Sequence, residues 1–145
     1  RLLAAKHFQS GMASVRQVEL ALVDLSLYRM LSTDVRTPEE LLAEVRSKVR
    51  VTPVYPDDRF LNGFQHIFGG GYAAGYYSYK WAEVIAADVF EAFKESGDVC
   101  SPEVGQRFFS TVLAQGAARP FMESFVAFHG RTPSEDALLR LTGLL

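Results

Sequence analysis

The sequence has very little cysteine and histidine. Cys100 is the only cysteine among 145 residues, so an intrachain disulfide and a zinc cluster built from several thiolates are both excluded. The three histidines, His7, His66 and His129, are widely separated along the chain. None of them belongs to a His-Glu-x-x-His pair, which would place two imidazoles one helical turn apart. The chain alone therefore offers no conventional zinc site.

Charge of one sign and long hydrophobic runs are also scarce. The 15 Lys and Arg residues nearly balance the 17 Asp and Glu residues, which leaves a formal net charge of -2. No segment gathers enough basic residues to attract nucleic acid or an anionic membrane surface. No hydrophobic run approaches the roughly 20 residues that span a bilayer, and the N-terminus lacks a secretory signal pattern. We expect no nucleic-acid partner, no membrane association and a cytoplasmic location.

Hydrophobic residues at helical spacing are abundant. At 145 residues and 48% hydrophobic composition, the chain can bury one substantial core, so we expect a single helical unit over residues 1–145. No segment alternates as a strand does, which predicts an all-α multi-helix bundle. The predicted helices cover residues 2–31, 37–50, 72–96, 101–116, 120–130 and 132–141. A long Gly-rich loop covers residues 51–71, with a short extended piece possible at 64–68.

The first predicted helix is amphipathic and bends near Gly11. Arg16, Glu19 and Asp24 lie mostly off its hydrophobic stripe. The stripe consists of Phe8, Met12, Val15, Val18, Leu22 and Leu25. Because the sequence opens at Arg1 without an initiator Met or a capping residue, as though inside a helix, we expect it to be a fragment of a longer polypeptide.

The segment from His66 to Tyr79 carries the most chemistry. If a helix begins near Tyr72, then Tyr72, Tyr76 and Tyr79 fall on one face, because steps of four and seven residues return to nearly the same direction. A neutral phenol donates a hydrogen bond and can stabilise a carbonyl oxygen that becomes negative. An aromatic stripe at this spacing is also typical of a hydrophobic core with phenols at its rim. Spacing alone leaves both interpretations open.

The sequence of this segment resembles one protein family. It reads His66-Ile-Phe-Gly-Gly-Gly-Tyr72-Ala-Ala-Gly-Tyr-Tyr-Ser-Tyr79-Lys-Trp81, and it is similar to a segment of the thimet oligopeptidase family of zinc metallopeptidases, in the oligopeptidase A and peptidyl-dipeptidase branch. The similarity continues through residues 3–19 and 105–133, so it covers essentially the whole chain. The bacterial branch usually has Ala where this chain has Gly69, and the extra glycine predicts a looser loop.

The resemblance implies the C-terminal segment of a larger, mostly helical, clam-shaped oligopeptidase or peptidyl-dipeptidase that hydrolyses short peptides. By position, Tyr79 matches the tyrosine that stabilises the tetrahedral intermediate. His66 and Tyr72 match residues of a mobile loop that contact substrate, and we group Gly69, Gly70 and Gly71 with them as substrate-binding residues.

Zinc belongs to the full-length enzyme, because in that family the ligands lie upstream of the segment that this chain matches. The expected partners are short peptides and the remainder of the parent polypeptide, and we expect the 145-residue chain alone to be inactive. The alternative is a stand-alone helical interaction domain that binds a peptide without cleaving it.

Overall fold

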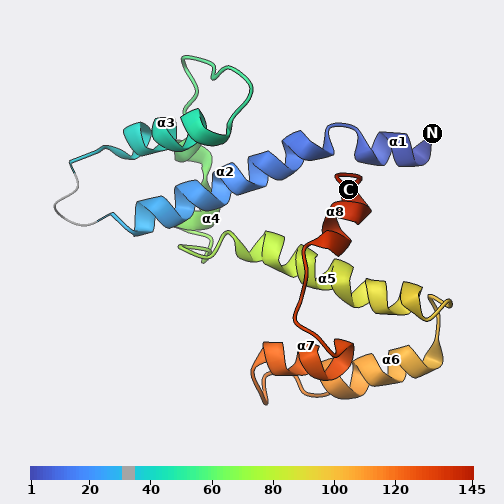
Figure 1. Ribbon diagram of the computed structural model, residues 1–145. Coiled ribbons are helices and arrows are strands. Elements are labelled where there is room, and N and C mark those ends of the chain that lie inside the picture. Colours follow the sequence, from blue (N-terminus) through green and yellow to red (C-terminus); the bar gives the residue numbers. More distant parts are fainter. Residues whose placement is uncertain (31–34) are drawn as a thin grey trace. The chain divides into compact units, whose positions relative to one another are not determined.

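The computed structural model describes residues 1–30 and 35–145, and its regular elements are helices (Figure 1). In chain order they are α1 (Leu2–His7), α2 (Ser10–Tyr28), α3 (Pro38–Val49), the 3-10 turn η1 (Phe60–Gly63), α4 (Gln65–Phe68), α5 (Ser78–Glu95), α6 (Pro102–Phe108), the π-helical turn η2 (Phe109–Leu113), α7 (Phe121–His129) and α8 (Asp136–Thr142). No strand occurs within these two described ranges, so the all-α prediction is confirmed there. None of the described helices is long and apolar enough to cross a membrane.

The chain divides into two compact units, residues 1–80 and residues 81–145, and the boundary falls inside α5. Each unit has hydrophobic clusters of its own. Whether residues 1–145 behave as the single unit expected from composition stays a prediction.

In the first unit, α2 packs against α3 and against the segment that contains η1 and α4. One buried cluster joins α2 to α3 and η1 and consists of Val23, Leu42, Val45 and Leu61. A second joins α2 to α4 through Leu20, Phe64 and Ile67. Phe64 and Ile67 are three residues apart, and one turn of helix turns both side chains toward Leu20. The prediction of an extended piece at residues 64–68 was therefore wrong.

The helix predicted over residues 2–31 is interrupted at Gln9. This residue has φ 55, a left-handed conformation that breaks the i to i−4 hydrogen-bond ladder, so α1 and α2 are separate helices. The break replaces the bend predicted near Gly11. The last helical residue is Tyr28, and the predicted end at Leu31 lies outside the described residues.

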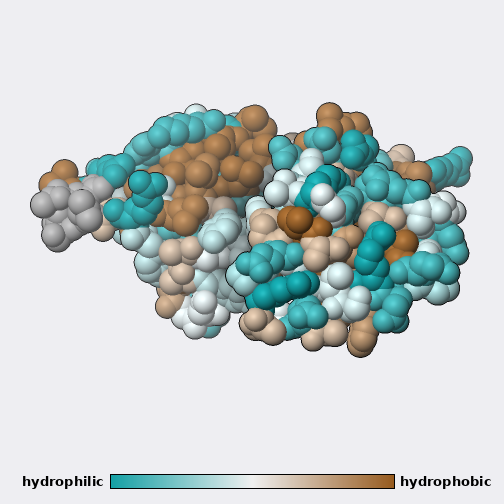
Figure 2. All heavy atoms as spheres, turned by 60° about the horizontal axis from the view of Figure 1, so that its bottom comes forward, coloured by the Kyte–Doolittle hydropathy of each residue, from teal (hydrophilic) through white to brown (hydrophobic). Residues whose placement is uncertain are grey.

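The buried face of α2 is not its most hydrophobic one. Glu19 and Asp24, which the sequence placed off the hydrophobic stripe, are 2% and 0% exposed. Four members of the stripe are 37–46% exposed instead, namely Met12, Val15, Val18 and Leu22. Figure 2 shows hydrophobic residues gathered in a broad brown area at the left of the view.

The N-terminus of α3 lies within the helix predicted over residues 37–50 and carries a capping box. Thr37 accepts a hydrogen bond from the backbone N–H of Glu40, and the Glu40 carboxylate accepts one from the backbone N–H of Thr37. This capping box satisfies two donors that the first helical turn leaves without partners, and Pro38 fits the first helical position. The helix ends at Val49, one residue before the predicted end.

In the second unit, the C-terminal half of α5 packs with α6, η2 and α7. Its buried cluster is Ala92, Val104 and Phe128, with Phe93 and Phe108 against it. The predicted ends of α5 and α7 hold, because these helices stop just before Gly97 and Gly130, whose positive φ only glycine adopts at little cost. The helix predicted to run to Gly116 differs, since α6 gives way to the π-helical turn at Phe109 and regular structure ends at Leu113. Ser101, at the start of the helix predicted over residues 101–116, caps α6 by accepting a hydrogen bond from the backbone N–H of Val104.

The start of α8 at Asp136 differs from the prediction, which began this helix at Thr132. Residues 132–135 are not helical, and the backbone N–H of Ser134 donates to the Asp88 carboxylate at 2.8 Å. This tertiary hydrogen bond occupies a donor next to the predicted helix start.

Candidate functional site

The helix α5 begins at Ser78, six residues later than the predicted start at Tyr72. Residues 72–77 form turns, and within them Ala74 has φ 54. The cause is tertiary: Asp24 on α2 accepts the backbone N–H groups of Ala74 at 2.8 Å and Tyr76 at 2.9 Å. Because these donors are already satisfied, the chain gains less by forming a helix here.

Four aromatic rings converge even though they do not share one helix. We call His66, Tyr72, Tyr76 and Tyr79 the aromatic cluster. The ring centroids of Tyr79 lie 5.1 Å from Tyr72 and 5.2 Å from Tyr76. The His66 ring lies 6.1 Å from Tyr72, 5.8 Å from Tyr76 and 6.3 Å from Tyr79. The structure therefore brings together three residues that the sequence singled out, His66, Tyr72 and Tyr79.

Exposure separates the members of the cluster. Tyr72 and Tyr79 are 40% and 38% exposed, and His66 is also exposed. Tyr76 is half-buried, packs on Phe64 with 5.2 Å between ring centroids, and donates from its phenol to Gln17 at 3.2 Å. The tyrosine stripe is thus core at Tyr76 and surface at Tyr72 and Tyr79, and the surface phenols are accessible to a ligand.

The cluster raises the pKa of two of its phenols, those of Tyr76 and Tyr79. The hydrogen bond between Tyr79 and Tyr72 is the first cause that raises the pKa of Tyr79, to about 12, and burial and the neighbouring phenols add to it. Burial raises the pKa of Tyr76 as well. A phenol that holds its proton at neutral pH is a hydrogen-bond donor, suited to an oxygen that gains negative charge.

The three glycines before Tyr72 have different surroundings. Gly71 has φ 81, which disfavours any side chain with a Cβ. At Gly70 an added Cβ would lie 2.9 Å from the His66 Cα and 3.0 Å from the His66 carbonyl oxygen. At Gly69 the nearest atom would be the Gln65 Cγ at 3.9 Å, an ordinary contact. Gly70 is therefore the position of this loop where the backbone packs against the chain itself, and a role of the three glycines in binding substrate stays a prediction.

Three residues on α2 hold this segment, and the sequence analysis identified none of them as a contact of the segment. Asp24 binds the turn, Gln17 accepts from the Tyr76 phenol, and Tyr28 donates from its phenol to the Ile67 carbonyl oxygen. All three contacts join residues at least 39 positions apart. A buried acid in an otherwise apolar stretch, Leu20-Ala-Leu-Val-Asp24-Leu, is the one local signal that could have indicated Asp24.

The described residues do not form a metal site. No group of three or more His, Cys, Asp or Glu side chains lies close enough to hold an ion within residues 1–30 and 35–145. The histidines lie on separate helices, His7 on α1, His66 on α4 and His129 on α7. Zinc ligation therefore does not fit the residues that the structure describes.

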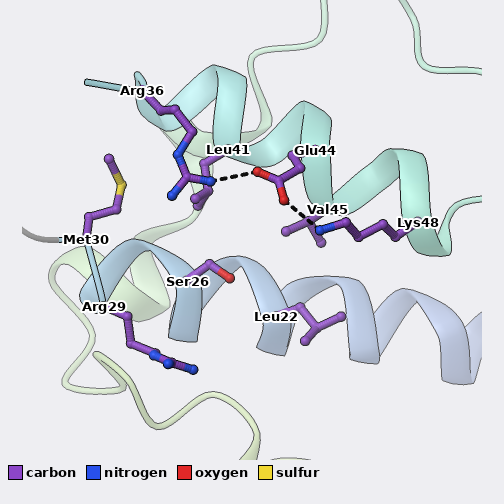
Figure 3. Close-up of a pocket in the computed structure, with 9 residues that line it drawn as sticks. All are labelled: Leu22, Ser26, Arg29, Met30, Arg36, Leu41, Glu44, Val45 and Lys48. Atoms are coloured by element: carbon purple, nitrogen blue, oxygen red, sulfur yellow. Dashed lines mark hydrogen bonds and ion pairs between the residues drawn. The ribbon is translucent and has the colours of Figure 1, made fainter. Parts of the chain in front are cut away.

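A concavity between α2 and α3 lies elsewhere in the first unit and has a volume of about 340 Å³. Its lining, drawn in Figure 3, is Leu22, Ser26, Arg29, Met30, Arg36, Leu41, Glu44, Val45 and Lys48. Glu44 pairs with Lys48 at 2.6 Å and with Arg36 at 2.7 Å, and these two hydrogen bonds lower the pKa of its carboxyl group. The aromatic cluster contributes no residue to this concavity.

Comparison with known proteins identifies the family. The sequence pattern described as "Peptidase family M3" matches residues 1–144. The chain belongs to peptidase family M3. This membership confirms the family that the segment from His66 to Trp81 indicated.

Relatives in the M3 family carry oligopeptidase and carboxypeptidase names. The "Probable cytosolic oligopeptidase A" of Arabidopsis thaliana is 49% identical over 100% of this chain and 21% of its own length. "Oligopeptidase A" of Escherichia coli is 42% identical over 99% of this chain and 21% of its own. "Dipeptidyl carboxypeptidase" of Salmonella typhimurium is 34% identical, with coverage of 99% and 21%. The chain spans about a fifth of the length of these M3 relatives and is homologous to a portion of an M3 oligopeptidase.

Proposed function

We propose that this chain is the C-terminal segment of a zinc-dependent oligopeptidase that hydrolyses short peptides, and that it supplies substrate-binding and oxyanion-stabilising side chains. The observation that carries the proposal is the convergence of His66, Tyr72 and Tyr79, whose ring centroids lie 5.1–6.3 Å apart with both phenols exposed. Peptides are proposed as the substrate because the chain belongs to peptidase family M3 and its relatives carry oligopeptidase names.

In this proposal Tyr79 acts as a donor to the scissile carbonyl oxygen. Its pKa of about 12 keeps the phenol protonated through the neutral range. As the carbonyl oxygen gains negative charge in the transition state, the phenol hydrogen bond strengthens, which lowers the barrier. His66, Tyr72 and the loop of Gly69, Gly70 and Gly71 that joins them contact the bound peptide.

The remainder of the polypeptide has to hold the zinc, because the residues described here do not fit a metal site. The remainder is then an obligatory partner of this chain, and the whole enzyme is proposed to be cytoplasmic. The 145-residue chain alone is expected to bind peptides weakly and to cleave none.

The test is the substitution Tyr79→Phe in the full-length polypeptide, with steady-state hydrolysis of a short peptide as the measurement. Loss of one oxyanion donor lowers kcat by roughly 10²–10³-fold with little change in KM. Tyr77→Phe is the matched control, because Tyr77 is exposed and lies outside the aromatic cluster. Equal kcat in Tyr79→Phe and the parent enzyme would remove Tyr79 from the reaction.

The alternative function, a peptide-binding domain without hydrolytic activity, makes a different prediction. It requires that the full-length polypeptide bind a short peptide and leave it intact with zinc supplied. Cleavage that depends on zinc, detected by mass spectrometry of the products, contradicts this alternative.

A further inference from the structure

Asp24 is fully buried on α2 and lies outside the aromatic cluster. Its residue exposure is 0%. One carboxylate oxygen accepts the Ala74 N–H at 2.8 Å, and the other accepts the Tyr76 N–H at 2.9 Å. Both oxygens of one buried carboxylate are thus directed at the turn of residues 72–77.

Among the described residues, two other carboxylates are as deeply buried as Asp24, and each of them pairs with an arginine. Burying a carboxylate is costly unless hydrogen bonds or an opposite charge compensate. Glu19 accepts from the Arg46 side chain at 2.9 Å, and Asp88 accepts from the Arg131 side chain at 2.6 and 2.8 Å. At Asp24 the two hydrogen bonds go to backbone N–H groups of a turn, so their effect is to fix the backbone of that turn.

The turn needs such support at Ala74. Its φ of 54 lies in the left-handed region, which costs free energy for a residue with a Cβ. The N–H of Ala74 itself is one of the two donors that Asp24 binds. The carboxylate therefore stabilises a strained conformation, and that conformation sets the direction in which the chain enters α5.

The direction of entry decides where two phenols lie. Tyr72 precedes Ala74 by two residues, and Tyr79 is in the first turn of α5, three residues after Tyr76. A shift of the turn moves both phenols relative to His66. The position of His66 is supported by the same helix, because Tyr28 donates to the carbonyl oxygen of Ile67, its neighbour in the chain.

The three α2 residues that make these contacts share one helix face. Gln17, Asp24 and Tyr28 are spaced by seven and four residues, and such steps return to nearly the same direction. Gln17 holds the Tyr76 phenol, Asp24 holds the turn and Tyr28 holds the end of α4. One face of α2 therefore contacts both segments that carry the aromatic cluster.

We propose that Asp24 is a positioning residue for the phenols of Tyr72 and Tyr79. It acts through the backbone of the 72–77 turn and touches no substrate. The inference deepens the proposed function and rests on it, since the phenols matter for hydrolysis only if they bind the peptide.

The test is Asp24→Asn in the zinc-loaded full-length polypeptide, alone and combined with Tyr79→Phe. The asparagine keeps one carbonyl acceptor but turns an NH2 group toward the second backbone N–H. Misplacement of Tyr79 lowers kcat by about 10–100-fold. Because the effect passes through Tyr79, the same substitution lowers kcat by less than about threefold in the Tyr79→Phe background.

Asp88→Asn is the matched control, because Asp88 is an equally buried carboxylate that accepts a backbone N–H. Its kcat is expected to stay within about twofold of the parent, since the residue contacts none of the cluster. An equal loss from Asp24→Asn in both backgrounds, or the same loss from Asp88→Asn, would show a purely structural role and overturn the inference.

A second measurement reads the position of Tyr79 without activity. In protein with isotope-labelled tyrosine rings, the Tyr79 signal is assigned by its absence in Tyr79→Phe. The ring currents of Tyr72, Tyr76 and His66 displace the chemical shift of this signal. We expect the shift to move toward its random-coil value in Asp24→Asn but not in Asp88→Asn. If Tyr79→Phe keeps full activity, the proposed role of Tyr79 fails, and this signal still decides whether Asp24 positions the ring.

If Asp24→Asn does not fold, a second variant takes its place in both measurements. Asp24→Asn combined with Ala74→Gly relieves the strain at the positive φ that could prevent folding, but the glycine does not replace the carboxylate that fixes the turn. The same kinetic coupling and the same movement of the Tyr79 signal are expected. An unmoved signal in this folded double variant contradicts the inference.

Discussion

Gly70 is the position where the glycine loop has no room for a side chain. An added Cβ would lie 2.9 Å from the His66 Cα and 3.3 Å from the Gln65 carbonyl oxygen, and both are backbone atoms. Gly70→Ala must displace α4, so we expect it to lower the free energy of unfolding by about 1–3 kcal/mol. Chemical denaturation of the chain measures this loss.

Gly69→Ala is the matched control for that prediction. Its nearest contacts are 3.9 and 4.0 Å away, and its φ is −131. The methyl group fits, and it reduces the freedom of the unfolded chain, so we expect a change between zero and about 1 kcal/mol of added stability. Equal losses from both substitutions would contradict the close approach at Gly70.

At this scale the sequence revealed residue types but not their surroundings. The resemblance marked Gly69 as the departure from the bacterial branch, and the structure gives a reason why Ala is tolerated there. The difference between Gly69 and Gly70 depends on the path of α4, which no local pattern contains. Capping is easier to predict from sequence, because the hydrogen bonds between Thr37 and Glu40 join residues within one helical turn.

At the scale of elements, Asp88 connects α5 to the segment before α8. Burial opposes its ionisation, but the hydrogen bonds from Arg131 and from the Ser134 N–H outweigh it, so the pKa of Asp88 lies below its usual value. A carboxyl group whose pKa is lower in the folded state stabilises the fold above its unfolded pKa of about 3.8, and this contribution is lost as the pH falls through the folded value.

Arg131→Gln tests this contribution. At pH 7 we expect a loss of about 1.5–3 kcal/mol, because a hydrogen-bonded charge loses its partner while Asp88 stays buried. The difference from the parent shrinks below about pH 4, where Asp88 of the variant is protonated. Arg140→Gln, an exposed arginine on α8, is the control and changes stability by less than about 0.5 kcal/mol. A loss that does not depend on pH contradicts the role of Asp88.

The same scale shows why some helix boundaries could not be predicted. Helices ended by glycine were placed well, because Gly97 and Gly130 act within one turn. The starts of α5 and α8 were placed too early. In both cases a distant carboxylate, Asp24 or Asp88, accepts backbone N–H groups of residues that the periodic pattern assigned to the helix.

At the scale of the whole molecule, the exposed side of α2 is the main difference between the pattern and the structure. The stripe of Met12, Val15, Val18 and Leu22 predicted an amphipathic helix, and that prediction assumed one partner surface. Polar contacts to Asp24 and Glu19 turn the other side inward. A long apolar strip is rarely left open to water in a complete protein.

Val18 provides the test of what covers this strip. In the 145-residue chain it is 46% exposed, so Val18→Lys changes the free energy of unfolding by less than about 0.5 kcal/mol. In the full-length polypeptide, where we propose that the remaining chain packs on the strip, the same substitution buries a charge and costs about 2 kcal/mol or more. Chemical denaturation of both proteins gives the comparison.

Val23→Ala separates this context effect from ordinary packing. Val23 is 0% exposed and belongs to the cluster that joins α2 to α3, so its truncation is expected to cost roughly 1–3 kcal/mol in both proteins. Only the cost of Val18→Lys should therefore depend on the length of the polypeptide. If it is equally small in both, the strip stays in contact with water in the full-length enzyme, and the remainder of the polypeptide must pack on another face.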